Sequence, residues 1–283
     1  MFIKFRCFLT SFLFFNYYDT PLHQAALKNS NETIDFLLSL PNIEIDENTF
    51  EGCNKLTHIK LPSSIESICE GFFSKYSSLE EVIFQTPCSL KIIGDNAFMQ
   101  CSSLRQITIP SSVTILDKFA FFGCSSLEKI FIPSSVTRIG FQTFCKCTSL
   151  EEVSFEIPSS VKSIQEEAFS ECSSLKQMRI PSSVESIEKA AFKGCCNLEK
   201  IENQSENDSF IEIIETSTFE GCSSLYEITI PSSVTAICND AFKDCSSLSK
   251  ISIPSSVASI GTGAFYHCPR LTQVLFESPC SMS

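Results

Sequence analysis

The chain has 283 residues, of which 43% are hydrophobic, and a formal net charge of −12 at pH 7. This much apolar surface is enough for a folded core and excludes global disorder. The acidic balance excludes nucleic acid and anionic membranes as charge-driven partners, because both require basic surfaces. No apolar run reaches the roughly 18 to 20 residues of a transmembrane helix.

Residues 1–18 form an apolar segment that begins with two basic residues. Lys4 and Arg6 precede the apolar stretch from Cys7 to Phe15, which is the order found in a secretory signal peptide. The stretch is short, rich in Phe, and lacks a small-x-small cleavage site before Tyr17. We therefore favour a packed helix remnant belonging to the next unit, with a signal peptide as the alternative.

Residues 19–46, DTPLHQAALKNSNETIDFLLSLPNIEID, resemble one ankyrin repeat. The T-P-L-H sequence opens the first helix, and Pro21 suits its first turn, where the missing N–H is not needed. His23 belongs to the same turn and has a structural role there. Because about three or more repeats are normally needed for stability, we expect this single helical unit either to cap the array that follows or to be the remnant of a longer array.

Residues 47–278 repeat one pattern about ten times. A Phe returns after 23, 25 or 27 residues, a Cys follows it by three positions except at Tyr76, and a Leu follows three positions later. One unit repeated this often predicts stacked structural coils, because a single coil cannot bury its own apolar side chains. The reference residues are Phe50, Phe73, Phe98, Phe121, Phe144, Phe169, Phe192, Phe219, Phe242 and Phe265.

Each unit contains a short strand followed by a corner. Ile130 and Ile132 alternate with Lys129 and Phe131, which predicts a strand with two inward and two outward residues. Pro133 ends this strand because proline cannot donate to a sheet ladder. The A-F-x-x-C sequence then closes the coil with a tight turn or one turn of helix. Ten coils about 4.8 Å apart predict a rod or shallow arc roughly 50 Å long.

The motif L-x-x-I-x-I-P-x-x-V-x-x-I-x-x-x-A-F-x-x-C resembles the 23-residue leucine-rich repeat of the BspA-like, or treponemal-type, family. The resemblance covers residues 47–278 and implies a solenoid with a parallel β-sheet on one face and turns or one-turn helices opposite. It extends to trichomonad surface antigens, and the family includes surface proteins implicated in adhesion. The resemblance thus implies the cell surface, whereas the ankyrin-like unit and weak signal favour the cytoplasm.

Insertions interrupt the period at three places, and we expect each to loop out of one face of the stack: 85–89, 156–157 and 202–210. The third is the most polar and predicts a mobile surface loop. Three sequons are candidate glycosylation sites if the chain is secreted: Asn31, Asn203 and Asn207. A short tail, residues 279–283, follows the last unit.

The chain has 16 Cys, and nine of them occupy the repeated position. There they predict a column of small, buried, reduced side chains. Disulfides and zinc are less favoured, since zinc sites group four ligands locally and no His is near. Of the three His, His58 and His267 sit in different coils without a carboxylate and a nucleophile in repeated register, and no catalytic or phosphate-binding motif is present. We expect no enzyme activity, no metal and no cofactor.

The outward positions of the strands differ between coils, whereas the inward columns do not. An exposed aromatic or aliphatic residue among mixed charges is typical of an interface centre. We therefore expect non-catalytic binding of a protein or glycan through the sheet face. The alternative is an intracellular structural scaffold that self-associates end to end. The candidate binding residues are Ile83, Lys129, Phe131, Arg179 and Tyr226.

Overall fold

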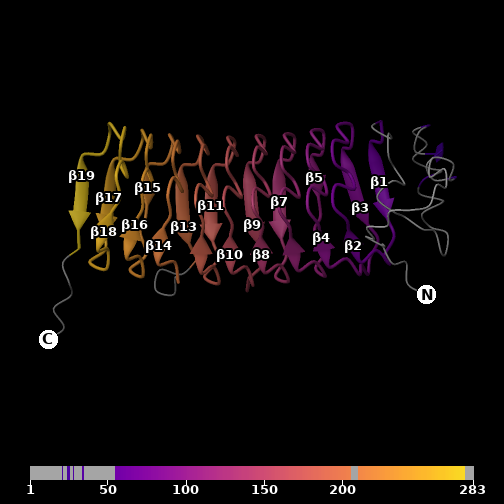
Figure 1. The fold of residues 1–283 in the computed structure, drawn as a ribbon, viewed down its shortest axis with the longest axis horizontal. Coiled ribbons are helices and arrows are strands. Elements are labelled where there is room, and N and C mark those ends of the chain that lie inside the picture. Colours follow the sequence, from indigo (N-terminus) through magenta and orange to yellow (C-terminus); the bar gives the residue numbers. More distant parts are fainter. Residues whose placement is uncertain are drawn as a thin grey trace, which may run out of the picture.

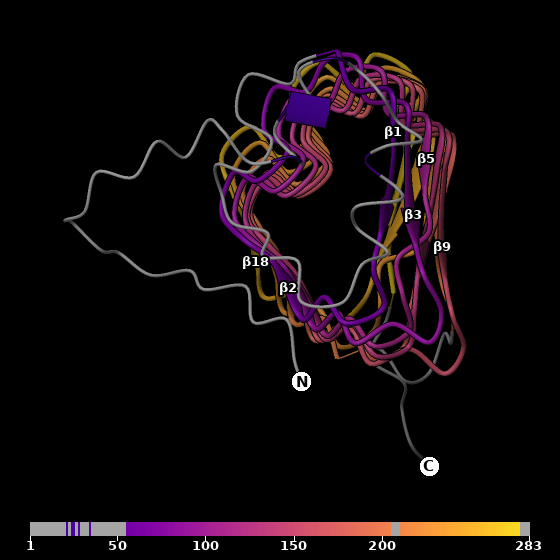
Figure 2. The ribbon, with the colours of Figure 1, turned by 90° about the vertical axis from the view of Figure 1, so that its right-hand side faces the viewer.

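The computed structural model is a rod of stacked coils, in which each repeat makes one circuit (Figure 1). Successive coils lie side by side along the long axis, and viewed down that axis they follow nearly one outline (Figure 2). The coil prediction is therefore confirmed. The structure describes residues 55–204 and 210–277, together with five positions near the N-terminus: Pro21, Gln24, Ala25, Lys28 and Ile34.

One side of the coils carries the longer strands, which we call the broad sheet. Its strands are parallel, and each pairs with the same repeat position of the next coil, as Lys129 does with Glu152. They form the ladders β1-β3-β5, β7 to β15, and β17-β19. The strands are β1 (His58–Leu61), β3 (Glu81–Phe84), β5 (Gln106–Ile107), β7 (Lys129–Ile132), β9 (Glu152–Phe155), β11 (Gln177–Ile180), β13 (Lys200–Asn203), β15 (Glu227–Ile228), β17 (Lys250–Ile253) and β19 (Gln273–Phe276).

A second side carries strands of two residues each, and all but β4 and β14 follow a Pro-Ser-Ser corner. These strands are also parallel, and they form the ladders β2 to β12 and β14-β16-β18. The inward residue of each strand is an Ile or Leu. The strands are β2 (Ser67–Ile68), β4 (Ile92–Ile93), β6 (Ile115–Leu116), β8 (Arg138–Ile139), β10 (Ser163–Ile164), β12 (Ser186–Ile187), β14 (Ile213–Ile214), β16 (Ala236–Ile237) and β18 (Ser259–Ile260).

The remaining side of each described coil is a turn, so the first of the two predicted alternatives, a tight turn, is confirmed and the second, one turn of helix, is wrong. The residues two positions before and two positions after the column Phe have left-handed backbone, as Phe119 (φ 56°) and Gly123 (φ 70°) do around Phe121. A right-handed helix cannot pass through such positions. They turn the amides toward the next coil, so that the Phe121 N–H donates to the Thr143 carbonyl at 2.9 Å.

The N-terminal predictions fall almost entirely outside the described residues. This applies to the segment 1–18, to most of the ankyrin-like unit 19–46, to the sequons at Asn31 and Asn207, and to the tail 279–283. The few described positions of the ankyrin-like unit do not establish such a repeat, which stays a prediction. In the third insertion, Asn203 ends strand β13 and is half-buried, and the loop positions 205–209 lie outside the described residues.

Two of the continuous columns in the core are formed by the repeated Leu and Phe side chains. The column leucines from Leu56 to Leu248 are fully buried, and Leu271 of the last described coil packs against them. The column Phe rings from Phe73 to Phe265 stack face to face, with centroids 5.3–5.7 Å apart and interplanar angles of at most 19°. Identical side chains in identical register let every coil fill the gap left by its neighbour.

The column cysteines do more than fill space. Each thiol from Cys101 to Cys268 donates a hydrogen bond to the carbonyl oxygen of the Phe in the preceding coil, over 3.0–3.2 Å. These thiols are free, as expected, and burial raises the pKa of Cys101 to about 12. Outside the column, Cys69 is disulfide-bonded, contrary to the expectation of reduced thiols.

We expect Leu127→Asp to destabilise the fold by about 4 kcal/mol or more, because it places an unpaired charge among fully buried side chains. Urea denaturation measures the loss. Thr137→Asp is the matched control, since Thr137 is exposed in the same coil. A Leu127→Asp protein that unfolds at the wild-type urea concentration would contradict the core assignment.

Alkaline pH should weaken the fold. Burial raises the pKa of the Cys101 and Cys147 thiols, whereas thiols of the unfolded chain titrate near pH 8.5. The native state therefore holds more protons above about pH 8.5, and stability falls there by up to about 1.4 kcal/mol per pH unit per buried thiol. Below that pH the contribution is fully present.

Urea unfolding in reductant at pH 7.5 and pH 10 tests this dependence. Cys147→Ala removes one buried thiol, so its loss of stability between the two pH values should be smaller by about 2 kcal/mol. The same loss in Cys147→Ala and wild type would show that buried thiols do not cause the effect.

Candidate binding surface

The outer face of the broad sheet presents side chains that the core does not use. Because side chains alternate along a strand, Ile130 of β7 is buried while Phe131 is 48% exposed. In the same way, Val82 of β3 is buried and Ile83 is exposed. The alternation predicted from the sequence is confirmed at these strands.

The five predicted binding residues are spread over this face. Lys129 and Phe131 share β7, while Ile83 on β3 and Arg179 on β11 each lie two coils away along the stack. Tyr226, which directly precedes β15, is also exposed. The structure therefore aligns them along the rod and does not gather them into one cluster.

Charged residues on the broad sheet pair between neighbouring coils. Lys129 Nζ lies 2.9 Å from Glu152 Oε2, and Arg179 NH2 lies 3.6 Å from Glu202 Oε2. The hydrogen bond with Glu152 raises the pKa of Lys129. Solvent screens these exposed pairs, so they contribute little stability. The Lys129–Glu152 pair neutralises charge beside the exposed Phe131.

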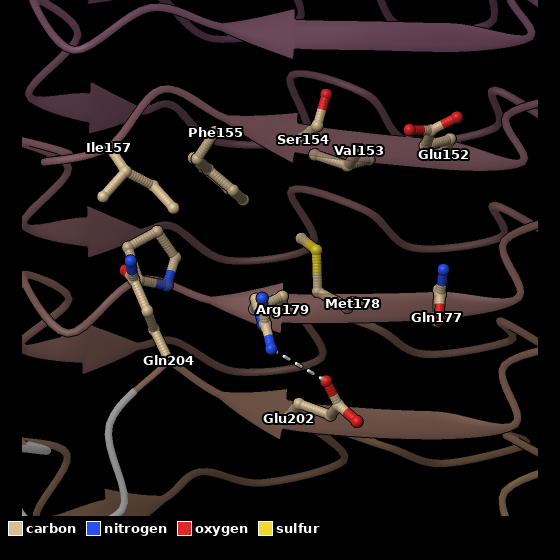
Figure 3. A pocket seen from close by; sticks show the side chains of 11 residues that line it. Glu152, Val153, Ser154, Phe155, Ile157, Gln177, Met178, Arg179, Glu202 and Gln204 are labelled. Atoms are coloured by element: carbon tan, nitrogen blue, oxygen red, sulfur yellow. Dashed lines mark ion pairs between the residues drawn. The ribbon is translucent and has the colours of Figure 1, made fainter.

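A cavity of about 430 Å³ opens on the broad sheet between β9 and β13 (Figure 3). The ladder between β9 and β11 stops after two residue pairs, the second being Val153 with Met178. Beyond that point the two strands diverge, and the inserted Glu156-Ile157 follows directly. The two extra residues enlarge one coil but not the next, which opens the space between them. We call this space the β9–β13 cavity.

The two ends of the β9–β13 cavity differ in chemistry (Figure 3). Phe155, the exposed Ile157 and Gln204 lie at one end, while Glu152 and Gln177 lie at the other. Arg179 stands between them and points to Glu202. The insertion and Arg179 are evident in the sequence, but the cavity is not, because the repeat pattern predicts a loop beside an intact sheet and carries no sign of the interrupted ladder.

The two described His side chains, His58 and His267, lie in different coils and far from each other along the rod. His58 Nδ1 lies 2.9 Å from the Thr57 hydroxyl, and His267 Nδ1 lies 3.2 Å from Asp244 Oδ1 near the C-terminal end of the rod. Within residues 55–204 and 210–277, no three His, Cys, Asp or Glu side chains are grouped to hold a metal ion. Among the same residues, no helix is long and apolar enough to cross a membrane.

A model of the BspA type leucine rich repeat region matches residues 16–151, 78–199 and 152–272. These matches together cover most of the sequence. The chain belongs to the BspA-type leucine-rich repeat family. No curated protein matches it by sequence. The resemblances to an ankyrin repeat and to trichomonad surface antigens stay predictions.

Several solved structures are similar to this BspA-type chain. A leucine-rich cell surface protein from Faecalibacterium prausnitzii is 28% identical, with 80% of each chain covered and a TM-score of 0.40. A leucine-rich repeat protein from Bacteroides ovatus is 26% identical, with 80% of each chain covered and a TM-score of 0.49. The leucine-rich repeat protein of T. pallidum is 23% identical over 79% of this chain and 72% of its own, with a TM-score of 0.41.

Two Phe residues of one coil, Phe131 on the outer face and Phe121 in the core, allow the two environments to be compared. We expect Phe131→Ala to change the unfolding free energy by less than about 1 kcal/mol, because the ring is half exposed. Phe121→Ala, which removes a fully buried ring from the stack, should cost about 3 to 5 kcal/mol. Equal urea midpoints for the two variants would contradict this division.

Proposed function

We propose that the chain is a non-catalytic binding module whose broad sheet holds a protein or glycan partner. The observation that carries this proposal is the exposure of Phe131 among paired charges, beside a cavity that opens on the same face. Exposed aromatic and Arg side chains are the groups that dominate binding energy at interfaces. Membership of the family supports the proposal. A more specific version of the proposed binding function is adhesion at the cell surface.

The alternative is a scaffold that assembles end to end, and one observation favours it. In the last described coil, Val274 and Phe276 are exposed, Phe276 by 69%. Their counterparts one coil earlier, Ile251 and Ile253, are each only 1% exposed. A further coil packed on this side would cover these side chains as the repeat does internally, and in the scaffold a second copy would supply that coil.

An array of purified extracellular proteins and glycans tests the binding proposal. We expect the wild-type chain to bind selected spots, and Phe131→Ala to lose at least about tenfold in affinity for them, as an interface anchor does. Thr137→Ala, on an exposed position away from the broad sheet, should bind like wild type. Equal binding by Phe131→Ala and wild type would remove Phe131 as an anchor.

Light scattering separates the two proposed functions. Particles whose mass grows with protein concentration, and which shrink when Phe276 is changed to Asp, would favour the scaffold. A monodisperse monomer at all concentrations would favour the binding module.

A further inference from the structure

The broad sheet carries a second cavity that is built like the first. It has a volume of about 440 Å³ and lies between β3 and β5, and we call it the β3–β5 cavity. Four lining residues of each cavity, a Glu, a Phe, a Gln and a Pro, stand at the same repeat positions, 71 residues apart. In the β3–β5 cavity these are Glu81, Phe84, Gln106 and Pro110. In the β9–β13 cavity they are Glu152, Phe155, Gln177 and Pro181.

The same change in the backbone opens both cavities. Each follows a coil with two extra residues, and in each the ladder to the next strand stops after two pairs, at Val82 with Ile107 and at Val153 with Met178. By contrast, the ladder between β7 and β9, which no insertion interrupts, continues over four pairs. The fold therefore forms the same opening twice on one face.

The spacing of the two cavities follows from the coil repeat. Strand β9 lies three coils beyond β3, which is about 14 Å at roughly 4.8 Å per coil. Phe131 on β7 lies between them and is exposed. An extended polypeptide advances about 3.4 Å per residue, so residues four apart lie about 14 Å apart and on the same side of the chain.

The lining groups indicate which side chains would fit. Each cavity has a Phe and a Pro as apolar lining groups and a Glu and a Gln as polar ones. The β9–β13 cavity also contains Arg179, which pairs with Glu202, whereas Thr108 stands at the equivalent position of the β3–β5 cavity. Basic side chains combine an aliphatic stem with a cationic head, so one such side chain can use both parts. Glu81 forms no ion pair with any described residue and accepts a hydrogen bond from Gln106 Nε2 at 3.4 Å. The net charge of −12 also favours a basic ligand.

We propose that the two cavities together bind one extended, basic polypeptide segment, which places Arg or Lys side chains four residues apart into them. The proposal rests on the proposed binding function and specifies its partner. The β3–β5 cavity contributes the larger share, because Glu152 of the other cavity already pairs with Lys129. The segment crosses the strands along the rod and contacts Phe131 on the way.

Labelled synthetic peptides test this inference by fluorescence anisotropy with the full chain. The probes are Gly-Ser peptides that carry two Arg four residues apart, two Arg three residues apart, one Arg, or two Glu four residues apart. We expect the first to bind about tenfold or more tighter than the second and third, because only it can occupy both cavities. The Glu peptide should not bind.

Matched variants test whether the peptide occupies the two cavities. Thr108 and Arg179 hold equivalent positions in the two linings, and Trp at either position would fill its cavity. Thr108→Trp and Arg179→Trp should each lower the affinity for the peptide with two Arg four residues apart to that for the one-Arg peptide. Ser252→Trp, in the same outward column but on β17, should bind like wild type. Thermal melting checks that all three variants fold.

The results of these experiments show separately whether the paired-cavity inference fails and whether the proposed binding function fails. Equal affinity for the four-spaced and three-spaced peptides, or no effect of Thr108→Trp, overturns the paired cavities. Failure of every peptide to bind, with glycan binding on the array, overturns the basic polypeptide but leaves the binding module intact. Failure on the array as well as with the peptides overturns both.

Discussion

The whole structure depends on stacking, because no coil can bury its own apolar side chains. The Phe rings show this directly, since each ring inside the described stack packs against one ring in the coil before and another in the coil after. The leucines and the Cys thiols follow the same rule in their own columns, and the thiols add a hydrogen bond to the preceding coil. A residue in these columns is therefore fixed by its neighbours along the rod, and this explains why the sequence repeats so closely.

The same constraint leaves the outer face of the broad sheet free. Side chains there contact solvent and the equivalent position of adjacent coils, so charge, size and shape can differ between coils without disturbing the columns. Insertions are tolerated for a related reason. The extra residues near Pro87 and Ile157 follow a strand, and the chain regains its register before the next Phe. What an insertion alters is the strand ladder beside it, and the two cavities are the result.

The residues that differ between coils and the residues that repeat thus lie in different parts of this molecule. A binding function requires differing residues, and these lie around Phe131 and Arg179 on the broad sheet. An assembly function requires a repeating end surface, and the exposed Val274 and Phe276 of the last described coil provide apolar side chains of that kind. Both proposals arise from one architecture, and they place the functional residues on different surfaces of the rod.

The sequence alone determined the period, the buried columns, the alternation within each strand and the corner at Pro133, because each depends on local spacing that recurs in every unit. It also identified Phe131 and Ile83 as exposed, since strand alternation fixes which way they point. Only the tertiary structure decided that the A-F-x-x-C segment is a turn, because left-handed backbone around Phe121 is stabilised by amides that donate to the next coil. It likewise decided the thiol hydrogen bonds and the cavities beside Phe84 and Phe155. The thiol hydrogen bonds and the cavities arise between neighbouring coils, the cavities where two coils differ in length, and spacing within one unit carries no information about them.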